Sequence, residues 1–262
     1  MSTAKIKLIE KIKEKKELSG LNNALVSDML ESYLEKYKLN LENLKNSEAK
    51  IIVKDIRRNL RDLVGRFQKS TKKRIKLSEI GDIEALLKTH SSTSERLNFY
   101  PRLKKLINEL NVKSILDLGC GLNPLALADK NIVYYASDIK EDDLELVKRF
   151  FEKNNLQGKA FVYDLRKISN DLPNADLCII FKVLDILEKK QHGLAEKILN
   201  FINCKYFLIS FATKSISGKP MKFPRRNWLE SILKKFNYKY RIFSPDNEIF
   251  YLIKKSKYSQ RL

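Results

Sequence analysis

The residues best suited to chemistry lie in the run from Ser114 to Leu125, where a short apolar segment ends in an acid and a glycine-rich turn. Gly119 and Gly121 have no Cβ, so the backbone here can adopt conformations closed to other residues and approach a ligand closely. In open α/β sheets, ligands bind at the carboxyl ends of strands, and this turn follows the first expected strand. The run therefore predicts a site for a nucleoside cofactor.

The residues around this turn indicate which nucleoside is bound. The dinucleotide fingerprint has a third glycine, where this chain has Leu125 after Asn123 and Pro124. Asp117 places a carboxylate where S-adenosylmethionine carries an ammonium and a sulfonium, whereas a pyrophosphate has no positive charge. Asp138 ends the next apolar run, where a carboxylate can accept hydrogen bonds from ribose hydroxyls. The pair favours S-adenosylmethionine; the alternative is that one acid only stabilises a turn and the other only begins a helix.

The charge of the chain narrows the class of partner. Its 262 residues include 52 Lys and Arg against 32 Asp and Glu, a formal net charge of +20. Such an excess favours an extended polyanion, either nucleic acid or an anionic membrane. No apolar run approaches the roughly 20 residues that cross a bilayer, and residues 1–20 lack the apolar segment of a secretion signal. We therefore expect a cytoplasmic protein without a membrane partner.

Cysteine and histidine give no sign of a metal or a disulfide. Cys120, Cys178 and Cys204 form no C-x-x-C pair, and His90 and His192 lie far apart in the sequence. Neither a disulfide framework nor a metal site is indicated.

The elements that must position these residues fall into two parts. Residues 2–89 show the three- and four-residue apolar spacing of helices, so we expect a helical RNA-binding domain over 1–100. Over 101–262 strand and helix patterns alternate, with strands expected at 114–118, 133–137, 159–163, 177–181, 205–210, 238–243 and 248–253. A turn sequence, 244–247, separates the last two, which predicts a terminal antiparallel hairpin. This is the α/β fold of class I S-adenosylmethionine-dependent methyltransferases, a seven-stranded Rossmann-like sheet.

The expected helical domain contains a strongly basic segment. Residues 50–76 include eleven Lys and Arg, opposed only by Asp55 and Asp62. On a helix these side chains would form a nearly continuous basic face, which would bind phosphates tightly and lose affinity as salt rises. The alternative is an ordinary solvated surface. The candidate RNA contacts are Arg57, Arg58, Arg61, Lys72, Lys73 and Arg74.

Five ordered motifs between residues 80 and 255 resemble those of the aminoglycoside-resistance 16S rRNA guanine-N7 methyltransferases. They are His90 to Leu97 with Tyr100, Asp117 to Leu127, Ala175 to Leu177 with Phe181-Lys182, Ile209 to Lys219, and Asn247-Glu248. The resemblance implies S-adenosylmethionine as cofactor and S-adenosylhomocysteine as product. It also implies a guanine N7 in the decoding-site helix (helix 44) of 16S rRNA as target, within the 30S subunit, and we expect a monomer.

The resemblance further implies roles for individual residues. Arg96 would bind the cofactor carboxylate through its planar fork. The cofactor would be held by Arg96, Asp117, Gly119, Gly121, Asp138, Asp164, Leu165, Phe181 and Gln191. Lys182 and Lys214 would position the substrate, and Lys219, Arg225 and Arg226 would contact RNA.

The sequence also departs from the family pattern at several positions. Lys214 stands where members often have arginine, and a lysine is a point charge without the fork. Asp185 stands where they commonly have proline, and the segment from Met221 to Trp228 differs from the usual pattern.

The chemistry that is implied needs few specialised groups. Guanine N7 has an in-plane lone pair and no proton, so positioning and desolvation would supply most of the rate, without a general base. Phe181-Lys182-Val183-Leu184 differs from the (N/D)-P-P-(Y/F) run of adenine-N6 enzymes. A target in a duplex would be flipped out of its stack. The alternatives are a methyltransferase of another RNA site, such as tRNA, and a non-catalytic RNA-binding ribosome-assembly factor.

Overall fold

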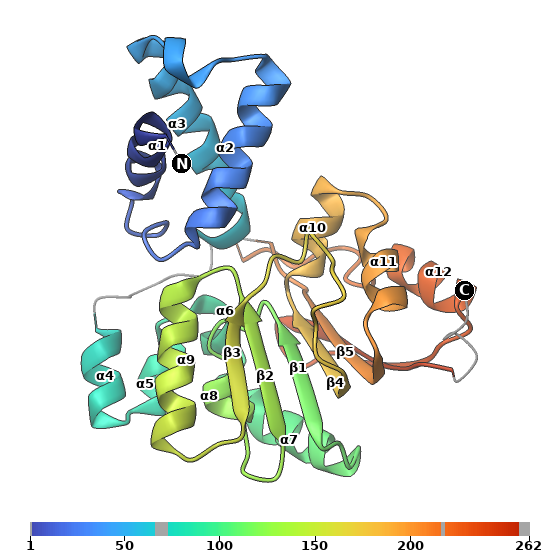
Figure 1. Cartoon of the computed structure of the whole chain (residues 1–262). Helices are drawn as coiled ribbons and strands as arrows, with labels where there is room; N and C mark the ends of the chain where they lie inside the picture. Colours follow the sequence, from blue (N-terminus) through green and yellow to red (C-terminus); the bar gives the residue numbers. More distant parts are fainter. Residues whose placement is uncertain (1, 66–72, 216–217, 257–262) are drawn as a thin grey trace.

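The amino-terminal part of the chain folds into helices around an apolar core of its own. We analysed a computed structural model that describes residues 2–65, 73–215 and 218–256. The amino-terminal elements are α1 (Thr3–Lys13), α2 (Asn23–Tyr37), η1 (Leu41–Asn43), α3 (Asn46–Leu60) and the π-helical turn η2 (Arg61–Gly65). Their apolar stripes meet in a core that extends from Leu8 to Val64. Figure 1 shows this lobe, the helical domain, above the sheet.

Seven strands form a single mixed sheet in the order β3-β2-β1-β4-β5-β7-β6. They are β1 (Ser114–Leu118), β2 (Val133–Asp138), β3 (Gly158–Val162), β4 (Ala175–Phe181), β5 (Cys204–Ala212), β6 (Lys239–Phe243) and β7 (Glu248–Lys254). The first five are mutually parallel, and β7 runs antiparallel to both β5 and β6. The predicted fold class is confirmed, because every expected strand and the terminal hairpin are present.

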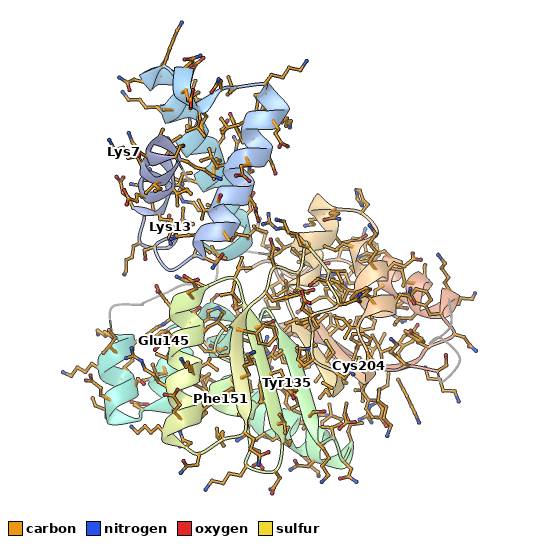
Figure 2. The ribbon with its side chains drawn as sticks, in the orientation of Figure 1. Lys7, Lys13, Tyr135, Glu145, Phe151 and Cys204 are labelled. Atoms are coloured by element: carbon orange, nitrogen blue, oxygen red, sulfur yellow. The ribbon has the colours of Figure 1, made fainter. Side chains whose placement is uncertain are left out.

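Helices cover both faces of the sheet, because strand side chains alternate between the two faces. On β1, Ile115 belongs to one apolar core and Leu116 to the other. In Figure 2, α9 turns Phe151 toward the sheet and Glu145 toward solvent. The helices on the first face include α5 (Ile83–Lys88), α7 (Tyr100–Glu109), α8 (Pro124–Leu127) and α9 (Glu141–Lys153); those on the second are α10 (Leu184–Lys190), α11 (Leu194–Phe201) and α12 (Asn227–Lys235). Within the described ranges, none of the helices is long and apolar enough to cross a membrane.

The division between the two parts lies earlier than residue 100. The core of the helical domain ends at Val64, whereas Leu86 and Leu87 already belong to the core of the sheet. The helices α4 (Arg74–Ile80), α5 and α6 (Ser91–Glu95) are therefore part of the α/β domain by packing. We place the boundary between residues 64 and 74.

Arg74 fastens α4 to the α/β domain. The residue is 5% exposed, and its Nε and Nη2 donate to Oγ1 and the carbonyl oxygen of Thr89 at 2.8 and 3.2 Å. Its Nη1 donates to the buried carboxylate of Asp143 on α9. All this places the guanidinium inside the protein, away from a phosphate backbone, and it corrects the prediction that Arg74 contacts RNA.

We expect Arg74→Met to lower the free energy of unfolding by about 3 kcal/mol, because the buried Asp143 would lose its cationic partner. Urea denaturation would measure the loss. Arg58→Met is the matched control: Arg58 has a side chain 71% exposed, and its replacement should change stability by less than about 0.5 kcal/mol. If Arg74→Met unfolded like the wild type but bound RNA more weakly, the internal role would be wrong.

Candidate cofactor site and substrate face

The glycine turn after β1 is held in one conformation by the end of β2. Gly119 and Gly121 have φ values of +71° and +50°, in the left-handed region that favours glycine. A Cβ on Gly119 would lie only 2.7 Å from Cγ2 of Val183, so a side chain cannot be added without displacement. The amide of Gly119 donates to the carbonyl of Ser137, and the amide of Gly121 donates to Oδ2 of Asp138, both at 2.9 Å. The turn and the second acid therefore form one unit.

A pocket lies beside this unit, at the carboxyl ends of the parallel strands. Among the predicted cofactor residues, those that line it are Gly119, Asp138, Asp164, Leu165 and Phe181. Gln191 does not join them: it is exposed at the end of α10 and is not among the lining residues. The contact of Gln191 with the cofactor therefore stays a prediction.

The two acids differ in what their carboxylates bind. Asp117 is fully buried; its Oδ2 accepts a hydrogen bond from the hydroxyl of Tyr134 at 2.7 Å, and its Oδ1 has no hydrogen-bond partner among the described residues. Asp138 accepts from the amides of Gly121, Ile139 and Lys140. Burial raises the pKa of Asp117 to about 7 and that of Asp138 to about 6.

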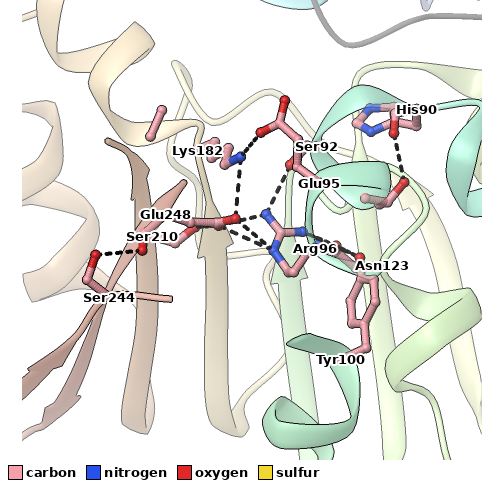
Figure 3. A network of polar contacts seen from close by, with 12 residues as sticks. His90, Ser92, Glu95, Arg96, Tyr100, Asn123, Lys182, Ser210, Ser244 and Glu248 are labelled. Carbon is pink, nitrogen blue, oxygen red and sulfur yellow. Dashed lines mark hydrogen bonds and ion pairs between the residues drawn. The ribbon is translucent and has the colours of Figure 1, made fainter. Parts of the chain in front are cut away.

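Arg96 lies behind the pocket with its guanidinium fully engaged. The residue is 2% exposed, and its Nε and Nη2 donate to the carboxylate of Glu248. Its Nη1 donates to Asn123 at 2.7 Å and to the hydroxyl of Tyr100 at 3.4 Å, and its Nη2 also donates to Ser92 at 3.0 Å (Figure 3). All five N–H groups of the fork are thus used. A cofactor carboxylate would have to replace one of these partners, so the predicted contact with Arg96 stays a prediction.

Phe181 and Lys182 end β4 next to this network. The ring of Phe181 is buried in the pocket wall, and the guanidinium carbon of Arg96 lies 4.4 Å from its centroid. Lys182 has a φ of +60°, unusual for a residue with a side chain, and is 8% exposed. Its Nζ donates to Oε2 of Glu95 at 2.6 Å and lies 3.4 Å from Oε2 of Glu248. The backbone strain thus directs the ammonium between two carboxylates at the strand end.

Several residues of the site carried little or no signal in the sequence. Glu248, at the start of β7, belongs to a motif that the sequence showed, but its contacts did not: it accepts hydrogen bonds from Ser210 on β5 and from Arg96, which only the folded chain reveals. Leu63 and Val64 line the pocket from the helical domain, and Val183 lines it after β4. A lone apolar residue has no motif, so only the folded chain shows these contacts.

Some of the arginines expected on the basic face of α3 make contacts within the helical domain. Arg57 donates to the carbonyls of Lys11 and Ile12 and so caps the carboxyl end of α1. Arg61 donates to Glu17 at 2.7 Å. Arg57 therefore has a structural role as well, and its contact with RNA stays a prediction; Arg58 is exposed.

The remaining basic candidates are also partly exposed residues and partly residues that make contacts inside the protein. Those that are exposed are Lys73, Lys214, Lys219 and Arg225, whereas Lys72 lies outside the described residues. Arg226 is 8% exposed; its Nε and Nη2 bind the carboxylate of Asp185, and Nη2 also donates to the carbonyl of Ala212 at 3.0 Å. Its predicted contact with RNA is therefore corrected: Arg226 joins the segment before α12 to α10.

The raised pKa values of Asp117 and Asp138 predict how stability depends on pH. Because the fold favours the protonated acids, their contribution to the free energy of unfolding is full below about pH 4 and is lost as pH rises through 6 and 7. Without cofactor, the wild type should lose roughly 2 kcal/mol more between pH 5 and pH 8 than Asp117→Asn does. Urea denaturation at both pH values measures the difference. The exposed Asp129→Asn should follow the wild type, and parallel profiles for Asp117→Asn would contradict the assignment.

Comparison with known proteins identifies relatives of this site. A 16S rRNA (guanine(1405)-N(7))-methyltransferase of Serratia marcescens is 32% identical over 143 residues, which are 53% of this chain and 56% of that protein. An enzyme of the same name from Micromonospora echinospora is 29% identical over 196 residues, 68% of this chain and 70% of that protein. The chain thus spans little more than half the length of the first relative.

Solved structures and a family model agree with these relatives. The 16S rRNA methylase RmtB superposes with a TM-score of 0.79 at 24% identity over 98% of this chain and 100% of that chain, which shows the fold. The 16S rRNA methylase ArmA does so with a TM-score of 0.58 at 28% identity over 71% of this chain and 100% of that chain. The model described as "Ribosomal RNA methyltransferase (FmrO)" matches residues 57–235, more than half of the sequence. The chain therefore belongs to the FmrO family of ribosomal RNA methyltransferases.

Proposed function

We propose that the chain transfers a methyl group from S-adenosylmethionine to N7 of a guanine in the decoding-site helix (helix 44) of 16S rRNA. The observation that carries the proposal is that Gly119, from the turn after β1, Asp138, at the end of β2, and Phe181, at the end of β4, line one pocket. The relatives from Serratia and Micromonospora, named as guanine-N7 enzymes of 16S rRNA, support the same chemistry.

The residues of the pocket fit this cofactor. Asp117, two residues before the lining residue Gly119, is fully buried and does not itself line the pocket; its Oδ1 has no hydrogen-bond partner among the described residues, and a carboxylate at this place favours a ligand with a cationic end. Asp138 keeps acceptor capacity beyond its three backbone contacts, which suits ribose hydroxyls. The left-handed glycine turn leaves room for close approach. When bound, S-adenosylmethionine supplies a methyl group on a cationic sulfur.

Residues at the substrate face position the base and exclude water. Guanine N7 carries its own lone pair, so the protein has no proton to remove and acts through placement. Phe181 forms an apolar wall of the pocket, and Lys182 brings a cation to its edge. The carboxylates of Glu95 and Glu248 fix the position of the Lys182 ammonium. The ammonium is therefore already in place when the target nucleotide binds.

The substrate we propose is the assembled 30S subunit, acted on by a monomer in the cytoplasm. The exposed cations Arg58, Arg61, Lys73, Lys214, Lys219 and Arg225 are the RNA contacts in this proposal. They lie on both domains, so both would meet the particle. Such contacts give an affinity that falls steeply as salt rises.

The test of the proposal is transfer of a labelled methyl group to isolated 30S subunits, followed by borohydride and aniline cleavage to map N7-methylguanine. We expect one cleavage in the decoding-site helix of 16S rRNA. Label in tRNA or at another rRNA position would show a different target, and no label in any RNA would show a non-catalytic assembly factor.

Lys182→Met should lower kcat on 30S subunits by about 100-fold while the Kd for S-adenosylhomocysteine stays within a factor of two or so, because Lys182 acts on the substrate. Single-turnover methylation and calorimetry give the two numbers. Lys189→Met, an exposed lysine on the neighbouring α10, is the matched control and should behave as the wild type. An equal loss of cofactor binding in Lys182→Met would place Lys182 in the cofactor site instead.

A further inference from the structure

The helical domain meets the α/β domain at the residues that directly follow Asp138. The amide of Glu141 donates to the carbonyl of Gly20 at 2.8 Å, and the amide of Asn22 donates to the carbonyl of Ile139 at 3.2 Å. Leu21 and Lys140 thereby form an antiparallel bridge. The end of β2, which carries the acid for the ribose, is fixed by backbone hydrogen bonds to the helical domain.

Side chains cross this junction in both directions. Ile139, next to Asp138, packs against the core of the helical domain. Leu63, from the helical domain, packs against the core of the α/β domain that contains Leu165. Both Ile139 and Leu63 line the cofactor pocket, together with Leu165. The pocket wall and the domain junction therefore share the same residues.

The element that brings Leu63 there is unusual. The α3 helix ends at Leu60, and the chain continues directly into the π-helical turn η2, which carries Leu63 and Val64 into the pocket wall. Such turns are rare and occur frequently at functional sites. Val64 is 6% exposed and belongs to the core of the helical domain while it lines the pocket. The helical domain thus reaches the pocket through part of its own core.

We propose that the helical domain completes the cofactor site, with Leu63 and Val64 forming an apolar cover over the adenosyl end. An adenine ring has two apolar faces, and binding sites for such ligands are lined mostly by apolar side chains. Beside Leu165, the α/β domain supplies Ile139 to the pocket wall, and Leu63 and Val64 are the apolar residues that the helical domain adds to it. The inference rests on the cofactor of the proposed function and is independent of its RNA target.

The cover makes cofactor affinity depend on how the helical domain is docked. Because linkage is reciprocal, a cofactor held by both domains also stabilises their docking by the same factor. When the cofactor is bound, the helical domain, which carries the exposed Arg58, is therefore held more firmly against the α/β domain.

The test is calorimetry with the full chain, using S-adenosylhomocysteine and 5′-methylthioadenosine, which lacks the amino-acid part. Leu63→Ala should weaken both ligands by about tenfold, because the lost methyl groups cover the part that the ligands share. Unchanged binding, or tighter binding, would overturn the inference. Tighter binding would mean that the Leu63 side chain occupies the space that the adenine ring needs. A loss confined to S-adenosylhomocysteine would also overturn it, because the cover would then lie at the methionine end.

Two further variants separate the cover from a general loss of stability. Val53→Ala removes methyl groups from the core of the helical domain, where Val53 is 4% exposed, but Val53 does not line the pocket, so the Kd should not change although the melting temperature falls. Leu63→Met keeps the apolar volume and should bind within about threefold of the wild type. A Val53→Ala loss equal to that of Leu63→Ala would reduce the effect to stability and overturn the inference.

The result of this test can be distinguished from the result of the test of the proposed function. If the wild type binds S-adenosylhomocysteine but labels no guanine in 30S subunits, the RNA target is wrong while the Leu63 result still decides the cover. If the wild type binds neither ligand, the proposed cofactor is wrong and the cover falls with it.

Discussion

The site depends on charge balance around one buried carboxylate, that of Glu248. Two cations, Arg96 and Lys182, bind it, and all three side chains are buried; a second carboxylate, that of the exposed Glu95, binds the lysine from the solvent side. Burying an unpaired charge is costly, and this set is tolerable because its charges cancel and its donors find acceptors. The network joins α6 and the residue after it to the ends of β4 and β7, which are far apart in the sequence. The cofactor pocket and the substrate face are therefore held by one electrostatic cluster rather than by loops that could move independently.

Basic residues in this chain serve two different purposes, which net charge alone does not separate. Three of the arginines expected on the RNA surface, Arg57, Arg74 and Arg226, use their guanidinium groups to hold helices and segments of the protein together. An arginine is suited to this task because it offers five N–H groups in a fixed plane and can satisfy several buried acceptors at once. The lysines expected at the same surface, so far as the structure describes them, stay exposed. Lysine, a flexible point charge, gains less from burial and is free to meet a phosphate.

The sequence was informative where the signal is local and weak where it depends on tertiary contacts. Alternating apolar residues and the turn from Ser244 to Asn247 predicted all seven strands and the terminal hairpin, because strand periodicity and turn chemistry act over a few residues. The acid and glycine turn was likewise readable, since Asp117 and Asp138 end adjacent strands. The partner of a long side chain could not be read in this way: Arg57 meets a carbonyl 45 residues away, Arg74 an acid 69 residues away, and Arg96 an acid 152 residues away. The apolar residues that the helical domain gives to the pocket have no spacing or motif that would mark them.

The ion pair between Asp185 and Arg226 gives two departures from the family pattern a common explanation. The resemblance implied that Asp185 and the segment of Arg226 both depart from the family pattern, and in the folded chain the guanidinium binds the carboxylate directly. Each residue alone would leave a largely buried charge without its partner, so the two are expected to be inherited together. In a chimera between this chain and a relative, a crossover placed between residues 185 and 226 would separate the two partners of this ion pair, although neither residue shows the dependence on its own.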